Sequence, residues 1–236
     1  MIDKDYTLTD HLAREIDSYA KYKYDLTIKF LTENGLKKSD RILNIGCGAA
    51  DFNIQIIRQG FKCDGFDEDE KAIEVGRNRL GSSDSKLKIC DISNSLKLFQ
   101  NYKFFVCHDV IEHIENDEEA FINITKLMRS KDSIIVITVP AFNFLFGIHD
   151  VKLGHYRRYT RKQLKSLVDK QLEILECRYV GFLGFFAALI YSRILKKSYP
   201  RQNAKSSEFL MKFSTLIERT IGCPFGSSVL LVGKLK

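Results

Sequence analysis

Residues 41–51 have the sequence RILNIGCGAAD, and this stretch decides the fold. Its apolar start at 42–45 is typical of a buried strand. The strand ends at Gly46 and Gly48, and residues compatible with a helix follow over 51–60. Glycines in such a turn adopt positive φ and let a ligand approach the backbone, and the amides that open the next helix point toward an anionic or polar group. The stretch therefore predicts a strand, a tight turn and a helix that together bind a ligand.

An acidic residue follows the next predicted strand, at 61–66. Asp67 lies 21 residues after Gly46. Nucleotide-binding α/β units place there the carboxylate that accepts hydrogen bonds from the two hydroxyls of a ribose. The turn, the spacing and the acid together predict a nucleotide-type cofactor site.

This combination resembles motif I of class I S-adenosylmethionine (SAM)-dependent methyltransferases, with Asn44 where an acid is usual and Ala50 where a third glycine is common. The resemblance implies SAM as the cofactor and S-adenosylhomocysteine (SAH) as its product. It implies cofactor contacts for nine residues: Asn44, Gly46, Cys47, Gly48, Asp67, Glu68, Asp91, Ile92 and His108. Taken alone, Asp91 is typical of a turn or a helix cap.

The remaining pattern predicts an α/β protein with a Rossmann-like, doubly wound sheet of seven strands. Strands are expected at 41–45, 61–66, 86–91, 102–107, 133–139, 172–180 and 226–235. Helices are expected at 10–36, 51–60, 69–80, from the end of the fourth strand to about 128, and at 161–170. An antiparallel last strand, a hallmark of the resembled family, argues against the competing nicotinamide-binding fold.

We expect one domain over 1–236, divided into an N-terminal helical cap (1–36), a cofactor-binding core (37–180), a helical insertion (181–225) and the last strand (226–236). Three tyrosines of the cap, Tyr19, Tyr22 and Tyr24, either approach the ligand or pack in the core.

Composition bounds the class of protein. Apolar residues make up 44% of the 236 residues and charged residues 28%, which is typical of a soluble globular chain. The net charge of +7 suits anionic partners or simple solubility. We expect no nucleic-acid partner, because a base-methylation signature and a separate basic domain are both missing. Six cysteines without a C-x-x-C pair, a polar start and no apolar run of about 20 residues predict a cytoplasmic protein.

Residues 108–114, HDVIEHI, resemble motif IV of the same family, and the IEH triplet resembles a variant found in ubiquinone-pathway O-methyltransferases. His113 is therefore a candidate catalytic group, although this Glu–His pair is often structural in the family. Asp109, Glu112 and His113 are also metal-ligand types. Because such sets are common by chance on amphipathic helices, we predict no metal.

Residues 141–160, AFNFLFGIHDVKLGHYRRYT, place aromatic and charged residues in a loop after a strand end, where open α/β sheets bind ligands. The loop resembles a signature of one group of bacterial methyltransferases. His155 and His149 are the other catalytic candidates. We assign acceptor binding to Tyr156, Arg157 and Arg158, since guanidinium groups bind carboxylates or phosphates bidentately. Alternatively, the histidines hold the loop in place and one arginine pairs with Asp150.

The insertion begins with the apolar stretch 181–192 and turns basic at Arg193, Lys196, Lys197 and Arg201. It could lie at a membrane surface or line a hydrophobic tunnel; a buried cap helix or a dimer contact is the alternative. We therefore predict a methyltransferase that modifies an oxygen or nitrogen of a small or lipid-linked acceptor, with peripheral membrane contact. A nicotinamide-dependent oxidoreductase and a non-catalytic SAM-binding protein are the rival functions.

Overall fold

The computed structural model describes residues 17–93, 99–198, 214–218 and 223–236. Its sheet has the order β3-β2-β1-β4-β5-β7-β6. The strands are β1 (Arg41–Ile45), β2 (Lys62–Asp67), β3 (Leu87–Ile89), β4 (Phe104–His108), β5 (Ile134–Pro140), β6 (Leu172–Val180) and β7 (Ser228–Leu235). The main helices are α2 (Ser18–Glu33), α3 (Asp51–Arg58), α4 (Glu70–Leu80), α5 (Asp117–Leu127), α6 (Ile148–Leu153), α7 (Arg161–Val168) and α8 (Phe182–Leu189).

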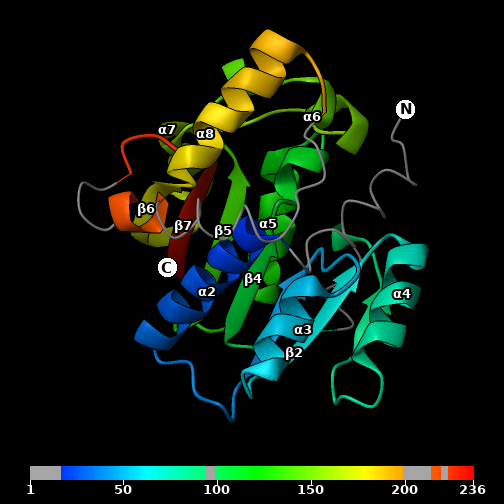
Figure 1. Ribbon diagram of the computed structural model, residues 1–236. Coiled ribbons are helices and arrows are strands. Elements are labelled where there is room, and N and C mark those ends of the chain that lie inside the picture. Colours follow the sequence, from blue (N-terminus) through cyan, green and yellow to red (C-terminus); the bar gives the residue numbers. More distant parts are fainter. Residues whose placement is uncertain (1–16, 94–98, 199–213, 219–222) are drawn as a thin grey trace.

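Helices cover both faces of the sheet, as the predicted doubly wound fold requires (Figure 1). Alternate residues of a strand point to opposite faces, and the core divides accordingly. Ile42 and Val106 pack with Leu31 of α2 and Ile56 of α3. On the other face, residues such as Leu43, Phe105 and Ile137 pack with Phe121 and Ile124 of α5 and Leu164 of α7. The central strands are therefore buried on both sides.

The last strand is antiparallel, as predicted. β7 lies between β5 and β6 and runs antiparallel to both. The pairing of β6 with β7 shifts register between Ile174 and Glu176, which marks a β-bulge in the outer strand β6. The Rossmann-like class and the antiparallel strand are thus confirmed.

The continuous helix predicted after β4 is wrong. The chain instead forms a short 3₁₀ helix, η2 (Ile111–His113), and then begins α5 at Asp117. Asn116 interrupts the helix, because its side chain accepts a hydrogen bond from the amide of Glu119 and so caps α5. Thr160 caps α7 in the same way, because its side chain accepts a hydrogen bond from the amide of Gln163.

The insertion begins as expected with a helix, α8, which continues as a π-helical turn, η4 (Ile190–Leu195). A short 3₁₀ helix, η3 (Asn143–Leu145), opens the loop after β5. The predicted helical residues 10–16, and Arg201 in the insertion, lie outside the described residues.

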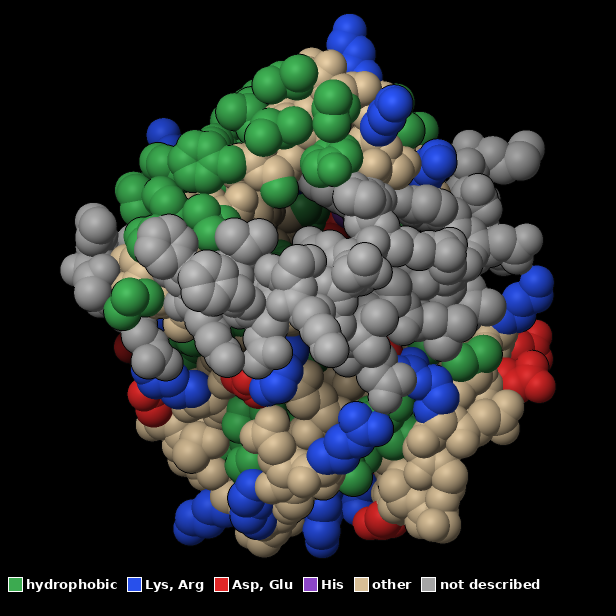
Figure 2. Space-filling model, viewed as in Figure 1, with side chains coloured by type: hydrophobic (Ala, Val, Ile, Leu, Met, Phe, Trp, Pro, Cys, Tyr) green, Lys and Arg blue, Asp and Glu red, His purple; other side chains and the backbone are tan. Residues whose placement is uncertain are grey.

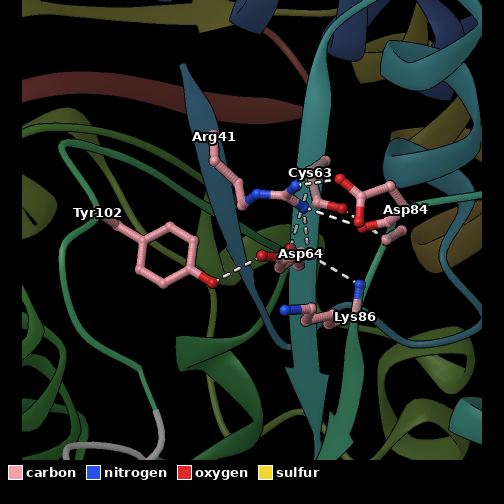
Figure 3. A network of polar contacts seen from close by, with 7 residues as sticks. Arg41, Cys63, Asp64, Asp84, Lys86 and Tyr102 are labelled. Carbon is pink, nitrogen blue, oxygen red and sulfur yellow. Dashed lines mark hydrogen bonds and ion pairs between the residues drawn. The ribbon is translucent and has the colours of Figure 1, made fainter. Parts of the chain in front are cut away.

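A buried carboxylate of β2 joins this strand to the amino-terminal ends of β1, β3 and β4 (Figure 3). Asp64 of β2 is 1% exposed and accepts hydrogen bonds from Arg41 Nη1 (2.8 Å), the amide of Lys86 (2.8 Å) and the hydroxyl of Tyr102 (2.7 Å). Burial and the Asp64 hydrogen bond raise the pKa of Tyr102. Arg41 also pairs with Asp84 at the surface. Asp64 therefore connects β1, β2, the start of β3 and the segment before β4.

Replacing Asp64 with Asn removes the charge and keeps the shape of the side chain. Because Arg41 and two further donors lose an ionised acceptor, we expect Asp64→Asn to lower the free energy of unfolding by about 3 kcal/mol. Urea denaturation followed by circular dichroism measures this change. Asp84→Asn is the matched control, since Asp84 faces the same Arg41 but its side chain is 73% exposed, and it should leave stability unchanged. Equal losses in both variants would contradict the central role of Asp64.

Candidate functional site

The glycine turn lies where β1 ends and α3 begins. Gly46 and Gly48 have φ of +64° and +50°, and Ala50, directly before α3, has +65°. A Cβ on Gly46 would lie 2.4 Å from Cγ2 of Val110, so this position requires glycine for its packing as well as for its φ. The turn therefore lies directly against the chain that leaves β4.

Asp67 ends β2 beside this turn. Its Oδ2 accepts a hydrogen bond from the amide of Gly48 at 2.7 Å, and its Oδ1 accepts one from the amide of Asp69 at 2.9 Å. Burial raises the pKa of Asp67, and these amide hydrogen bonds oppose the rise. Glu68, the next residue, is exposed. The structure thus brings together the glycine turn and the acid that were predicted to share a cofactor.

Asp91 and Ile92 follow β3. Asp91 is exposed, and its Oδ1 accepts hydrogen bonds from the amide (2.6 Å) and hydroxyl (2.5 Å) of Ser93. Ile92 is partly buried against the core. Asp91 therefore has the turn-capping contact that was the alternative, and its contact with a cofactor stays a prediction.

Asn44 and His108 lie inside the protein, on the sheet face that α2 and α3 cover. Asn44 donates to Asn53 Oδ1 at 2.7 Å. The two ring nitrogens of His108 lie 3.2 Å from the hydroxyl of Thr27 and 3.0 Å from that of Thr138. Strand alternation explains this placement, since both residues share the face of Ile42 and Val106. These contacts fasten the helices to the sheet, and a role for either side chain in cofactor binding stays a prediction.

The loop after β5 is organised around Asp150. This fully buried carboxylate accepts hydrogen bonds from His155 Nδ1 at 2.8 Å, from Arg158 Nε and Nη2 at 2.8 and 2.9 Å, and from the amide of Gly147 at 2.8 Å. Burial alone would raise the pKa of Asp150, but the hydrogen bonds from His155 and Arg158 outweigh it and lower the pKa to about 2. An ionised Asp150 thus fixes the ring of His155 and the guanidinium of Arg158.

Three ligand-type residues converge beside this loop. Glu112, His113 and His155 each offer an atom within 4.8 Å of the others, and the two histidine rings meet edge to face with centroids 4.5 Å apart. The amide of Tyr156 donates to the carbonyl of Glu112 at 2.8 Å, which joins the loop to η2. One carboxylate and two imidazoles are ligand types that a divalent cation binds, so this cluster, and not the Asp109 set weighed from sequence, could hold a metal.

The other predicted acceptor residues differ in their surroundings. Arg158 is 5% exposed and is occupied by Asp150, as the alternative interpretation of the loop stated. Arg157 pairs with Asp117 at 2.7 Å and donates to the carbonyl of Glu115, yet 29% of its side chain is exposed. Tyr156 is 53% exposed, and His149 on α6 is partly buried. Arg157 also lines a cavity of about 320 Å³ between α5, the loop and α7.

Sequence reasoning missed Lys23. Its ammonium forms a buried ion pair with Asp109, the residue directly after β4, at a distance of 2.5 Å. The only signal in the sequence was that Lys23 shares a helix face with Thr27. No local pattern predicts a partner 86 residues away.

Comparison with known proteins gives a consistent family. The family described as a methyltransferase domain matches residues 36–178. Ubiquinone biosynthesis O-methyltransferases of Rickettsia bellii and Rickettsia typhi are 26% and 27% identical over 143 residues, which is 57% of this chain and 59% and 57% of those proteins. The match therefore spans less than two thirds of these relatives.

Solved structures show the same fold. A complex of the Haloferax volcanii Trm112 methyltransferase activator with a methyltransferase matches with a TM-score of 0.62 at 12% identity, over 99% of this chain and 97% of that chain. A SAM-dependent methyltransferase from Archaeoglobus fulgidus matches with 0.57 at 16% identity, over 89% and 92%.

The residues at the carboxyl ends of β1 and β2 fit a SAM nucleoside. Gly46 and Gly48 have positive φ, as a turn that a ligand approaches closely requires, and the carboxylate of Asp67 lies beside them. The family match covers more than half of the chain and includes these residues. The chain therefore belongs to the methyltransferase domain family.

Proposed function

We propose that this protein transfers the methyl group of SAM to a hydroxyl oxygen of a small or lipid-linked acceptor, with His155 as the general base. One observation carries the proposal: His155 Nδ1 is hydrogen-bonded to the ionised carboxylate of Asp150. An imidazole that donates from Nδ1 keeps the lone pair of Nε2 as an acceptor. Asp150 thus prepares His155 to take a proton, as a carboxylate does for a catalytic histidine in hydrolases.

The cofactor would be held by the turn at Gly46 and Gly48, with Asp67 binding the ribose hydroxyls. When bound, SAM supplies an electrophilic methyl group on a sulfonium. The protein then needs to orient the acceptor for in-line displacement and to remove its proton, and good orientation alone is worth about 7–11 kcal/mol. His113 borders His155 and is the second catalytic candidate, and Arg157 and Tyr156 are the exposed candidates for acceptor contact. The alternative is transfer to an amine, which the same base would also serve.

Two observations support an oxygen acceptor that is lipid-linked. The relatives from Rickettsia, at 26–27% identity, are named as O-methyltransferases of ubiquinone biosynthesis, which supports an oxygen acceptor. An apolar surface beside the loop supports the lipid part. We call it the α8 face: Phe186, Ile190, Ile194 and Leu195 from α8 and η4, with Phe144, Ile148 and Val151 from the loop, all 41–70% exposed.

The two parts of the α8 face adjoin each other. Arg193 donates to the carbonyl of Phe144, and a Cβ on Gly147 would lie 2.9 Å from the Cβ of Ser192. Figure 2 shows hydrophobic side chains gathered over α8, with Lys and Arg near them. Arg193, Lys196 and Lys197 are exposed. Apolar side chains with basic neighbours favour an anionic membrane surface. Among the described residues, no helix has the length and apolar character to cross a bilayer.

Asp67→Ala should remove the anchor for the ribose. Because an ionised acceptor of two hydrogen bonds is lost, we expect the dissociation constant of SAH to rise at least about 100-fold, as measured by isothermal titration calorimetry. Glu70→Ala, at an exposed position in the first turn of α4, is the control and should change the constant less than about threefold. Equal weakening by both variants would contradict the assignment of the ribose to Asp67.

His155→Gln should lower kcat by about 10²- to 10⁴-fold and leave SAH affinity unchanged, because only the proton acceptor is lost. Asp150→Asn should act in the same direction, since a neutral amide no longer holds the Nδ1–H tautomer. SAH release with dihydroxybenzoic acid, its dodecyl ester and phosphoethanolamine measures these rates and separates oxygen from nitrogen acceptors. Preference for phosphoethanolamine would overturn the choice of oxygen.

The alternative role for His155 is to bind a metal together with Glu112 and His113. If His155 acts as the base instead, dialysis against a chelator should leave kcat unchanged. Loss of activity in the chelator, restored by Mg²⁺, Mn²⁺ or Zn²⁺, would contradict a role for His155 as a base.

Ile190→Asp should abolish sedimentation with vesicles of phosphatidylglycerol and phosphatidylcholine, because it introduces a charge into the α8 face. Ile122→Asp is the matched control: Ile122 is 42% exposed on α5 and Ile190 is 43% exposed on η4. Wild-type protein that stays in the supernatant, or equal behaviour of both variants, would contradict the membrane contact.

A further inference from the structure

A buried ion pair links the N-terminal helix to the end of β4. Lys23 of α2 is 7% exposed, and lysines are almost never buried without a partner. Its Nζ lies 2.5 Å from Oδ2 of Asp109, whose side chain is 14% exposed. Removing one member of a buried ion pair leaves the other charge uncompensated, which is far more costly than removing both. The pair therefore constrains both segments strongly.

The backbone at Asp109 is in an unusual conformation. Its φ is +53°, in the left-handed region that side chains other than glycine, asparagine and aspartate rarely adopt. Thr138 of β5 contacts it twice: the carbonyl accepts from the Asp109 amide at 2.9 Å, and the hydroxyl donates to Asp109 Oδ1 at 3.2 Å. With Lys23 on the second oxygen, both carboxylate oxygens are bound. These contacts hold the chain in the left-handed turn.

This turn is the neighbour of the cofactor site. Val110 follows Asp109 and packs so closely on Gly46 that a Cβ there would collide with it. A shift of Asp109 would carry Val110 against or away from the glycine turn. The chain of contacts thus runs from Lys23 through Asp109 and Val110 to Gly46.

The same helix also contacts the end of β6 and the insertion that follows it. The hydroxyl of Tyr19 donates to the carbonyl of Val180, and that of Tyr22 donates to Glu218, whose other oxygen accepts from the amide of Phe182 at the start of α8. α2, which lies across the face of the sheet in Figure 1, therefore connects the acceptor side of the molecule with the turn after β4.

We propose that Lys23 is a positioning residue for the cofactor turn. Its ammonium holds Asp109 in the left-handed conformation, and through Val110 this sets the position of Gly46. The packing of α2 on the sheet and the binding of the cofactor are then coupled. Coupling of this kind is reciprocal, so cofactor binding should stabilise the packed position of α2 by the same free energy by which packed α2 favours cofactor binding.

Lys23→Met keeps the length of the apolar stem and removes the charge. We expect it to raise the dissociation constant of SAH about tenfold or more in calorimetry. Lys21→Met is the matched control on the same helix, since Lys21 pairs with Asp25 at 2.7 Å but its side chain is 65% exposed. It should leave SAH affinity unchanged. Hydrogen exchange supplies a second readout: SAH should slow exchange in residues 18–27 of the wild type and have less effect on that segment in Lys23→Met.

The charge itself is tested by a double variant. Asp109→Asn tolerates the left-handed conformation and lacks the charge, so Lys23→Met combined with Asp109→Asn should regain part of the lost affinity, because no buried charge remains unpaired. Asp109→Asn alone should weaken SAH about fivefold or more, which tests the link even if Lys23→Met does not fold. The proposal is overturned if Lys23→Met or Asp109→Asn lowers the melting temperature but leaves SAH affinity within about twofold of wild type. Slowed exchange in α2 that is equal in wild type and Lys23→Met would overturn it as well.

Discussion

Burial of the central parallel strands on both faces is the constraint on which the rest of this structure depends. With α2 and α3 on one side and α5 and α7 on the other, a polar side chain inside a strand has no water to contact. It must find its partners within the protein, and Asn44, Asp64 and His108 all do so. Groups that bind small molecules are then left to the carboxyl ends of the strands, where Gly46, Asp67 and the loop after β5 lie.

The carboxylates at this edge of the sheet differ in the groups that donate hydrogen bonds to them. Asp150 accepts hydrogen bonds from a histidine, an arginine and an amide of the loop. Its charge is therefore paired within the loop, and its effect is to orient His155. Asp109 accepts hydrogen bonds from a lysine and a threonine, and these contacts fix the backbone of its own turn. Within the described part of the chain, Asp67 accepts hydrogen bonds from amides and forms no ion pair, which suits a carboxylate that is to accept hydrogen bonds from the hydroxyl groups of a ligand. Pairing thus separates the acids that shape the site from the acid proposed to contact the cofactor.

The elements that could be predicted from sequence are those with a local cause. The strand at 41–45 and its glycine turn follow from a short apolar run and two glycines, and the central strands follow from similar runs. The helix break at Asn116 was missed, although an asparagine three residues before Glu119 is a capping pattern. Asp150, His155 and Arg158 are close in sequence, and their pairing was one of two interpretations. The Lys23–Asp109 pair, the approach of Val110 to Gly46 and the meeting of His113 with His155 depend on tertiary packing, which no spacing along the chain encodes.

The place of β7 in the sheet has a consequence for synthesis on the ribosome. β5 is complete at Pro140, but its outer neighbour β7 ends at Leu235, and among the described strands β6 pairs only with β7. A ribosome that adds about 5–20 residues per second needs roughly 5–20 seconds for the intervening chain. For that interval the nascent protein carries an open hydrogen-bonding edge on its most apolar strand, IIVITVP. Such an edge is where a nascent chain is exposed to aggregation and where a chaperone on the ribosome would shield it.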